Sequence, residues 1–308
     1  MTHRRPGHGP PAGYREELLP TMPSLGKLYA TAMARTGRLV LAKPVAHDLP
    51  KVALRVDGVR ADAAGLSDYQ HLVGEPGTDE LPAGYVHVLA FPLAMAVMVR
   101  EDFPLPVLGM VHVANRVEQH HRLDLDETVT VRAWAQEARE HARGVTVDLV
   151  TEVTYDGTLA WRGASTYLAK GRPPKGLPLR PATERPERAD RAERPQPPSE
   201  PTAVWRLSGV AARYAEVSGD RNPIHVSRLG ARLFGFKRPI AHGMYTASRA
   251  LAGTPAALRR RPFVWTVDFA KPVLLPATVE YACDPSGQHA VWSRRSKSVH
   301  LTGRVEAL

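Results

Sequence analysis

Cysteine is almost absent from this chain, and its scarcity excludes two kinds of site. The 308 residues include one cysteine, Cys283, so no disulfide can form within the chain. A metal site built on several thiolates is excluded for the same reason. Cys283 ends the alternating run TVEYAC, where it is expected to be a small buried strand residue.

Long hydrophobic runs are also missing. The most apolar stretch, residues 86–99, is about 14 residues long and contains a histidine and a proline, whereas a membrane-spanning helix needs roughly 20 apolar residues. It predicts a buried core helix. The first residues, MTHRRPGHGPPAGY, lack the apolar segment of a secretory signal. A soluble cytoplasmic protein without membrane insertion is therefore expected.

Basic residues are in excess, with 41 lysines and arginines against 31 acids, a formal charge of +10 and a pI near 9.9. Such a balance is compatible with a polyanionic partner. No RNA- or DNA-binding motif accompanies it, so no nucleic-acid partner is expected. An acidic carrier protein or the phosphates of coenzyme A would suit a basic surface equally well.

The first half of the chain predicts one helix, a second apolar helix and then strands. Residues 1–24 are polar and basic, which predicts a disordered tail. A helical period over residues 25–37 has an apolar face made of Leu25, Leu28, Tyr29 and Ala32. The apolar helix is expected to begin near Val88 or Phe91. Four antiparallel strands are expected at residues 108–117, 128–137, 144–155 and 159–168, and Asp156-Gly157 predicts a hairpin turn between the last two.

The second half repeats this order after a change of composition. Proline and charged residues dominate residues 171–201, which predicts an extended linker with almost nothing to bury. A short strand at 204–207 and a helix capped by Ser208 follow. An apolar helix from Gly243 to about Ala257 then precedes strands at residues 263–270, 278–283, 289–293 and 299–306.

Three stretches of the two halves can be aligned in the same order, which indicates a duplicated domain. The aligned stretches are residues 61–65 with 215–219, 81–83 with 238–240, and 111–117 with 267–273.

Asp220, Asn222 and His225 form a compact group of polar residues around Pro223. The proline disfavours helical geometry at Asn222, so a turn is expected. A turn can direct the carboxylate and the imidazole at one point, where together they could hold and polarise a water molecule. The alternative is structural: Asp220 caps a helix and His225 is an ordinary loop histidine.

A second turn, Ile240-Ala241-His242-Gly243-Met244, opens the apolar helix of the second half. A glycine at a helix start presents a free N–H at the positive end of the helix dipole. Gly243 could therefore hold a thioester carbonyl and stabilise an enolate-like oxyanion. The alternative is a glycine needed only for a tight entry turn.

These two turns resemble a known family. YAEVSGDRNPIH at residues 214–225 and IAHGM at 240–244 are similar, in residue types and spacing, to the signature of the MaoC-like (R)-specific enoyl-CoA hydratases. Stretches of the first half resemble the N-terminal part of actinobacterial 3-hydroxyacyl-thioester dehydratases: GKLYATA, LPAGYVHVLAFPLAM and GMVHVANRVEQ. The resemblance implies an α+β fold, the double hot-dog, with two antiparallel sheets each wrapped around a central helix.

The resemblance also implies site residues and a division of labour. Asp220 and His225 would carry acid–base chemistry, the Gly243 N–H would form the oxyanion site, and Asn222 would hold the turn or the water. The first half has Leu66-Ser67-Asp68-Tyr69-Gln70-His71 where the motif is expected, without Asn-Pro. The implied organisation is a tail (1–24), a non-catalytic acyl-binding hot-dog domain (25–170), a linker (171–201) and a catalytic hot-dog domain (202–308).

The implied function is a hydro-lyase that dehydrates (3R)-hydroxyacyl thioesters or hydrates trans-2-enoyl thioesters of coenzyme A or acyl-carrier protein. Two alternatives remain: a hot-dog acyl-CoA thioesterase and a non-catalytic acyl-thioester-binding partner subunit. The histidines match no common metal-ligand spacing, so neither a metal nor another cofactor is expected. A monomer, whose halves pair like two subunits, or a homodimer is expected.

Overall fold

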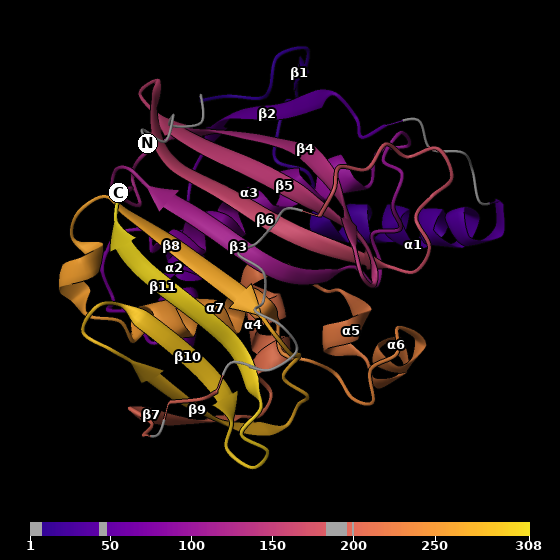
Figure 1. Ribbon diagram of the computed structural model, residues 1–308. Helices are drawn as coiled ribbons and strands as arrows, with labels where there is room; N and C mark the ends of the chain where they lie inside the picture. Colours follow the sequence, from indigo (N-terminus) through magenta and orange to yellow (C-terminus); the bar gives the residue numbers. More distant parts are fainter. Residues whose placement is uncertain (1–7, 43–47, 183–195, 199) are drawn as a thin grey trace.

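The computed structural model describes residues 8–42, 48–182, 196–198 and 200–308. One 11-stranded sheet runs through it in the order β1-β2-β4-β5-β6-β3-β8-β11-β10-β9-β7 (Figure 1). The strands are β1 (Arg15–Leu18), β2 (Val52–Val59), β3 (Val111–Gln119), β4 (Val129–His141), β5 (Gly144–Tyr155), β6 (Thr158–Lys170), β7 (Ala203–Leu207), β8 (Phe263–Phe269), β9 (Ala277–Cys283), β10 (Gln288–Ser293) and β11 (Val299–Ala307).

The helices lie mainly on one side of this sheet. They are α1 (Leu25–Ala42), α2 (Ala63–Val73), α3 (Ala83–Met98), α4 (Val210–Ser218), α5 (Pro223–Val226), α6 (Arg228–Leu233), α7 (Gly243–Ala252) and the 3₁₀ helix η1 (Ala256–Arg259). Helix α3 packs on the strands of the first half and α7 on those of the second (Figure 1). Among the described residues, no helix has the length and apolar character to cross a membrane.

The longest strands form where the sequence alternates or is rich in β-branched residues. β5, GVTVDLVTEVTY, is buried along most of its length because a strand in the middle of a sheet is covered by packing and by its neighbours. The hairpin predicted at Asp156-Gly157 is confirmed. Both residues have positive φ, 45° and 72°, the backbone geometry that suits the right-handed twist of paired strands.

The two halves meet where β3 and β8 pair antiparallel, with Arg116 opposite Thr266 at the centre of the pairing. Each half enters its central helix in the same way. Leu81 N donates to Leu123 O before α3, and Ala241 N donates to Val273 O before α7. These matching contacts relate the halves by an approximate two-fold axis.

The predicted repeat is therefore confirmed in its order of elements but wrong in its register. Because Arg116 faces Thr266 across the axis, Val117 is equivalent to Val267 and not, as the sequence alignment had it, to Val273. In this strand the alignment was displaced by an even number of residues. An even shift leaves the alternation of a strand unchanged, so apolar pattern alone cannot detect it.

The expected disorder of residues 1–24 is wrong for residues 8–24. β1 pairs parallel with β2, with Arg15 opposite Val52. The Tyr14 hydroxyl donates to Ala135 O over 2.8 Å, and Gly9 N donates to the Glu152 carboxylate. The backbone is ordered because an open sheet edge offers it hydrogen-bond partners, which composition does not reveal. Residues 1–7 lie outside the described residues.

The linker predicted at residues 171–201 is described only in part, because residues 183–195 and 199 lie outside the description. Its first part is less exposed than expected: Leu177 is buried, and Arg180 N donates to Ala138 O. Arg180 thereby pairs with the end of β4, in a parallel bridge with Arg139.

Some helix and strand boundaries also differ from the prediction. The region before α2, for which no strand was predicted, contains β2. Helix α3 begins at Ala83, directly after Pro82, because the proline disfavours a longer helix but suits its entry. Gly209 rather than Ser208 precedes α4, with a left-handed φ of 68° and no side-chain cap. Helix α7 ends at Ala252, earlier than expected.

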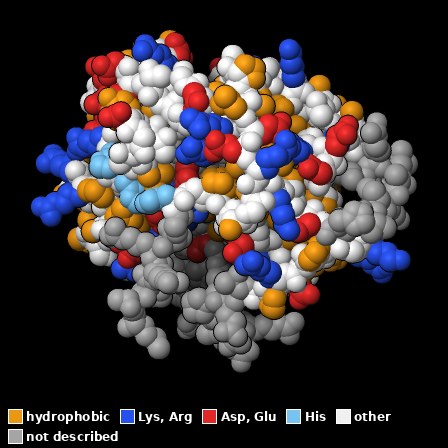
Figure 2. Space-filling view, turned by 90° about the horizontal axis from the view of Figure 1, so that it is seen from above, with side chains coloured by type: hydrophobic (Ala, Val, Ile, Leu, Met, Phe, Trp, Pro, Cys, Tyr) orange, Lys and Arg blue, Asp and Glu red, His pale blue; other side chains and the backbone are white. Residues whose placement is uncertain are grey.

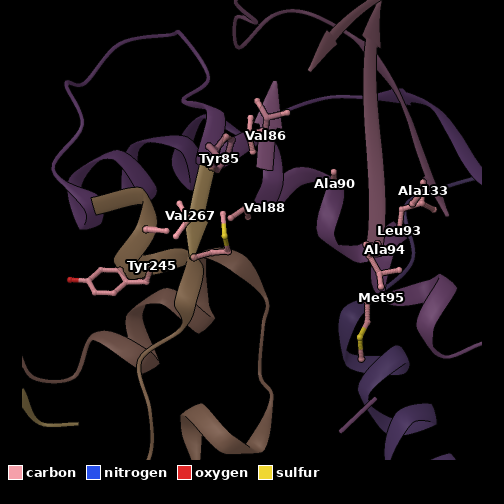
Figure 3. Close-up of a cluster of buried hydrophobic side chains, with 14 of the residues drawn as sticks. Tyr85, Val86, Val88, Ala90, Leu93, Ala94, Met95, Ala133, Tyr245 and Val267 are labelled. Carbon is pink, nitrogen blue, oxygen red and sulfur yellow. The ribbon is translucent and has the colours of Figure 1, made fainter. Parts of the chain in front are cut away.

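Helix α3 is buried on almost all sides, and its side chains fill the core beneath the sheet (Figure 3). The close-up brings Tyr85 and Val88 of α3 into one cluster with Tyr245 of α7 and Val267 of β8. The core is therefore continuous between the halves. The surface differs from this apolar core. On the face seen from above, basic and acidic side chains are interspersed, and they form no continuous basic patch (Figure 2).

Gly84→Ala is expected to destabilise the fold by about 2 kcal/mol, because overpacking a core position exceeds the gain in helix propensity. A Cβ on Gly84 would collide with Tyr69 Oη of α2 and Ser248 Oγ of α7, where three helices meet. Urea unfolding measures the change. Gly26→Ala in α1 is the matched control, since its Cβ would meet only Ser24 Oγ at 3.9 Å; equal effects of the two substitutions would contradict the explanation.

Candidate active site

The D-x-N-P-x-H stretch begins where α4 ends. Gly219 closes α4 in the left-handed conformation, with φ 70°, and its N–H donates to Ala215 O. Asn222 then caps α5, because its side-chain oxygen accepts from Ile224 N at 3.3 Å, and Pro223 occupies the first helical position. The predicted turn is therefore present, and it is followed by one short helical turn that carries His225.

Asp220 sits at the centre of this turn with 21% of its side chain exposed. Its Oδ1 accepts from Asn222 N at 3.1 Å and from the hydroxyl of Tyr29, which belongs to α1. Its Oδ2 lies 3.8 Å from Nε2 of His242. Among the described residues, Oδ2 accepts no hydrogen bond, so it is the oxygen free to bind a ligand.

His225 is held in one tautomer by the backbone. Its Nδ1 lies 2.8 Å from Ile240 O, and a carbonyl can only accept, so Nδ1 carries the proton and Nε2 is left as an acceptor. Burial and the neighbouring His242 lower the pKa of His225 to about 3. The imidazole is therefore neutral at physiological pH and able to accept a proton.

His242 joins the two turns. Its Nε2 donates to Asp220 O over 2.9 Å, and its ring stacks on that of His225 with centroids 3.8 Å apart. Its Nδ1 is buried and has no partner among the described residues. Burial lowers the pKa of His242 as well. This residue therefore fixes the position of the Asp220 backbone relative to the start of α7.

The pKa of Asp220 is lowered from its ordinary value. Burial acts to raise it, but the imidazoles of His242 and His225 and the hydrogen bond from Tyr29 more than offset that effect. An ionised carboxylate and a neutral imidazole consequently stand side by side. Within the described part of the chain, two acceptors of this pair take no hydrogen bond: Oδ2 of Asp220 and Nε2 of His225.

Gly243 is the first residue of α7, and its N–H belongs to the first turn, where a helix offers no internal acceptor. Among the residues that the structure describes, no side chain caps this end of α7. A Cβ at Gly243 would lie 3.1 Å from the Phe269 ring, so the glycine also permits close packing there. The helix dipole makes this N–H a favourable place for an oxygen that gains negative charge.

Asp220, Asn222, His225 and Gly243 all line one cavity of about 360 Å³. The walls come from both halves of the chain. The first half contributes an apolar side made of Val88, Phe91, Met95, Met98 and Met110. Three exposed basic residues also border the cavity: Arg143, Lys170 and Lys271. The cavity thus has a polar end, an apolar wall and a basic opening.

Asp220, His225 and His242 also form a group whose potential metal-ligand atoms lie within 4.8 Å of one another. Each imidazole already gives one nitrogen to a main-chain carbonyl, and the rings stack rather than converge on a point. The donor set therefore fits a metal ion poorly and suits proton transfer.

The first half carries a different residue at the place of Asp220. Gly74 ends α2 with φ 81°, as Gly219 ends α4 with φ 70°, so Glu75 is the counterpart of Asp220. The Glu75 carboxylate accepts two hydrogen bonds from Nη1 of Arg259, at 2.8 and 3.0 Å. It is engaged in an ion pair, and no imidazole of the described residues is bonded to it.

Residues 66–71 were the wrong counterpart of the motif, because they lie inside α2, which continues to Val73. The sequence between Gly74 and Ala83 contains no histidine.

A second cavity, of about 300 Å³, opens at the start of α3, and it is bordered by Arg122, Arg259, Arg260 and Arg261.

The structure brings together all four predicted site residues and adds two that sequence reasoning did not place there. Tyr29 was predicted as an apolar-face residue of the first helix, and His242 as a turn residue. The position of His242 beside Gly243 was a usable signal. For Tyr29 no local signal exists, since its partner Asp220 lies in the other half of the chain.

Comparison with known proteins gives a consistent result. The family described as MaoC like domain matches residues 184–306. The chain is 35% identical over 274 residues to 3-hydroxyacyl-thioester dehydratase X of Mycobacterium tuberculosis, covering 86% of this chain and 92% of the relative. It is also 40% identical over 70 residues to 3-hydroxybutyryl-CoA dehydratase of Methylorubrum extorquens, covering 22% of this chain and 45% of that protein.

Solved structures agree with this result. The crystal structure of HtdX from Mycobacterium tuberculosis superposes with a TM-score of 0.71 at 32% identity, covering 83% of this chain and all of the other. A MaoC-like dehydratase from Phytophthora capsici has the same fold, with a TM-score of 0.62 at 20% identity, covering 83% and 95% of the two chains. The expected α+β double hot-dog is thereby confirmed, although its two expected sheets are joined into one by the pairing of β3 with β8. This chain belongs to the MaoC-like dehydratase family.

Proposed function

We propose that this protein is a hydro-lyase of fatty-acid metabolism that interconverts (3R)-hydroxyacyl thioesters and trans-2-enoyl thioesters. One observation carries the proposal. The free oxygen of an ionised Asp220, the acceptor nitrogen of a neutral His225 and the start of α7 at Gly243 border the same cavity. A carboxylate, a base and an oxyanion site are the groups that addition of water to an enoyl thioester requires.

In the hydration direction, a water molecule binds between Asp220 Oδ2 and His225 Nε2. Its proton passes to this pair as its oxygen forms a bond to Cβ. The electrons of the double bond move toward the thioester carbonyl, whose oxygen becomes enolate-like and accepts a hydrogen bond from Gly243 N–H. A proton returned to Cα restores the carbonyl and completes the hydroxyacyl thioester. Dehydration follows the same steps in reverse, with water as the leaving group.

The proposal also includes the (3R) configuration of the hydroxyacyl group and the group that carries the thioester, coenzyme A or acyl-carrier protein. The configuration rests on the resemblance of the D-x-N-P-x-H turn to that of the (R)-specific hydratases. The basic residues at the cavity opening, Arg143, Lys170 and Lys271, suit the phosphates of coenzyme A or of a carrier-bound phosphopantetheine. The apolar wall from α3 suits the acyl chain.

A division of labour between the halves is also proposed. The domain at 202–308 carries the catalytic groups, and the domain at 25–170 receives the acyl chain, so each chain has one active site. The ion pair of Glu75 with Arg259 supports this division, because it occupies the counterpart of Asp220. A monomer whose halves pair like subunits, or a homodimer of such chains, is compatible with it.

Purified protein mixed with a trans-2-enoyl-CoA is expected to remove the conjugated enoyl absorbance, since hydration saturates the double bond. Chiral analysis of the product should give the (3R)-hydroxyacyl ester. Release of free thiol without hydration would instead identify a thioesterase. Tight binding without turnover, for several chain lengths and on both carriers, would identify a non-catalytic binding subunit.

A further inference from the structure

Helix α1, at the start of the first hot-dog domain, reaches the catalytic turn of the second. Tyr29 is 91% buried, lines the cavity, and donates its hydroxyl hydrogen to Asp220 Oδ1. The two residues are separated by most of the chain length. The proposed active site is therefore bordered by both hot-dog halves, and α1 is among the elements that the first half contributes.

Packing keeps α1 in this position. Leu25, at its start, touches Gly219, where a Cβ would come within 2.6 Å of Leu25 Cδ1. Ala32 is fully buried in the main core. Farther along, the Arg35 guanidinium donates to Phe103 O at 3.0 Å and to Glu101 O at 3.1 Å. Contacts of α1 on both sides of Tyr29 in the sequence therefore fix the helix. Moving the Tyr29 hydroxyl away from the Asp220 carboxylate would require these contacts to be lost.

The two oxygens of Asp220 have different surroundings. Oδ1 takes both hydrogen bonds, one from Tyr29 and one from Asn222 N, and Oδ2 takes none among the described residues. We infer that Tyr29 is a positioning residue of this active site: its hydroxyl fixes Asp220 Oδ1 and thereby turns Oδ2 toward the bound water. This inference rests on the proposed function.

The protonation states fit this role. Burial and the Asp220 carboxylate raise the pKa of Tyr29 far above its ordinary value, so the phenol stays neutral and remains a donor. Its hydrogen bond favours the ionised carboxylate, so removing it should raise the pKa of Asp220. The other titratable groups that interact with Asp220 are His225, His242, His87, His112, Tyr167 and Tyr214.

Burial shifts the pKa of each of these other groups away from neutrality. The pKa of His87 is lowered to about 4 and those of His112 and His225 to about 3, each chiefly by burial. Burial also raises the pKa of Tyr167 and Tyr214. Loss of activity on the acid side of the pH profile is therefore expected only below about pH 5 in the native protein.

Tyr29→Phe keeps the ring and removes only the hydroxyl. It should lower kcat/KM for an enoyl-CoA about tenfold at neutral pH, and it should raise the midpoint of the acid limb by about one pH unit. Initial rates after a rapid pH jump, between about pH 2.5 and 8, measure both effects, because kcat/KM reports the free enzyme. Tyr29→Met repeats the test if phenylalanine packs poorly.

Two further variants separate this role from a merely structural one. Tyr167→Phe removes a hydroxyl from the same cavity without a bond to Asp220, and Leu25→Ala loosens α1 on Gly219 but keeps the phenol. Neither should move the acid midpoint. An unmoved midpoint in Tyr29→Phe, or an equal shift in Leu25→Ala, would overturn the inference. An inactive native protein would instead refute the proposed function itself.

Discussion

Asp220→Asn is expected to lower kcat for enoyl-CoA hydration by about a thousandfold, the range typical of a lost acid–base group. Asparagine has the same shape, so it can still accept from Tyr29 and Asn222 N at its remaining oxygen. It cannot take a proton, and the amide that replaces Oδ2 presents donors where the carboxylate presented an acceptor. Single-turnover rates with a trans-2-enoyl-CoA measure the loss, and circular dichroism and urea unfolding check that the fold persists.

The matched control for this substitution is Glu75→Gln. Glu75 occupies the counterpart of Asp220 in the first half, so the same chemical change is made at an equivalent place. Its carboxylate is paired with Arg259, so the variant should lose stability. Its kcat should stay close to that of the native protein. A comparable loss of kcat in both variants would show that the first half takes part in the chemistry.

How much of this site the sequence predicts depends on how local its geometry is. Asp220, Asn222 and His225 are brought together by one helix end, one proline and one short helical turn, and each of these has a residue-level signal. The start of α7 at Gly243 is signalled in the same way. These features could therefore be predicted from a few neighbouring residues.

Contacts between distant segments have no such signal. Tyr29 follows a helical period and is buried, as predicted, but the pattern cannot distinguish a core tyrosine from one that donates to a carboxylate in the other half. The parallel pairing of β1 with β2 escaped prediction for a related reason. A polar segment at a sheet edge is ordered by backbone hydrogen bonds, which depend on the edge and not on the side chains.

The register of the repeat shows a third kind of limit. Alternating strands look alike after any even shift, so the order of the elements was predictable and the alignment of residues was not. Hydrogen bonds at the entries to α3 and α7 establish the equivalence. That equivalence in turn changes the chemical argument, because it moves the counterpart of Asp220 from within α2 to Glu75.

His225→Asn is expected to lower kcat by at least a hundredfold while preserving the turn, since one acid–base group typically contributes a factor of 100 to 10,000. The asparagine amide can replace Nδ1–H as the donor to Ile240 O, a bond of 2.8 Å in the native protein. Asparagine has no atom at the position of His225 Nε2, which is the proton acceptor. The variant therefore removes the base and keeps the hydrogen bond that shapes the turn, and single-turnover hydration rates measure the result.

His242→Gln is the control for the imidazole stack, because glutamine can still donate to Asp220 O as Nε2 does now. A loss of about tenfold, well below that of His225→Asn, is expected if His242 positions Asp220 without exchanging protons with substrate. The pH dependence of kcat/KM gives a second test of the role of His225. With a pKa of about 3, His225 stays a neutral base from pH 8 down to about pH 5, so kcat/KM should stay flat over that range. A fall with a midpoint near 6.5 would mean that a charged imidazole forms in the free enzyme, which contradicts the role of His225 as a buried neutral base.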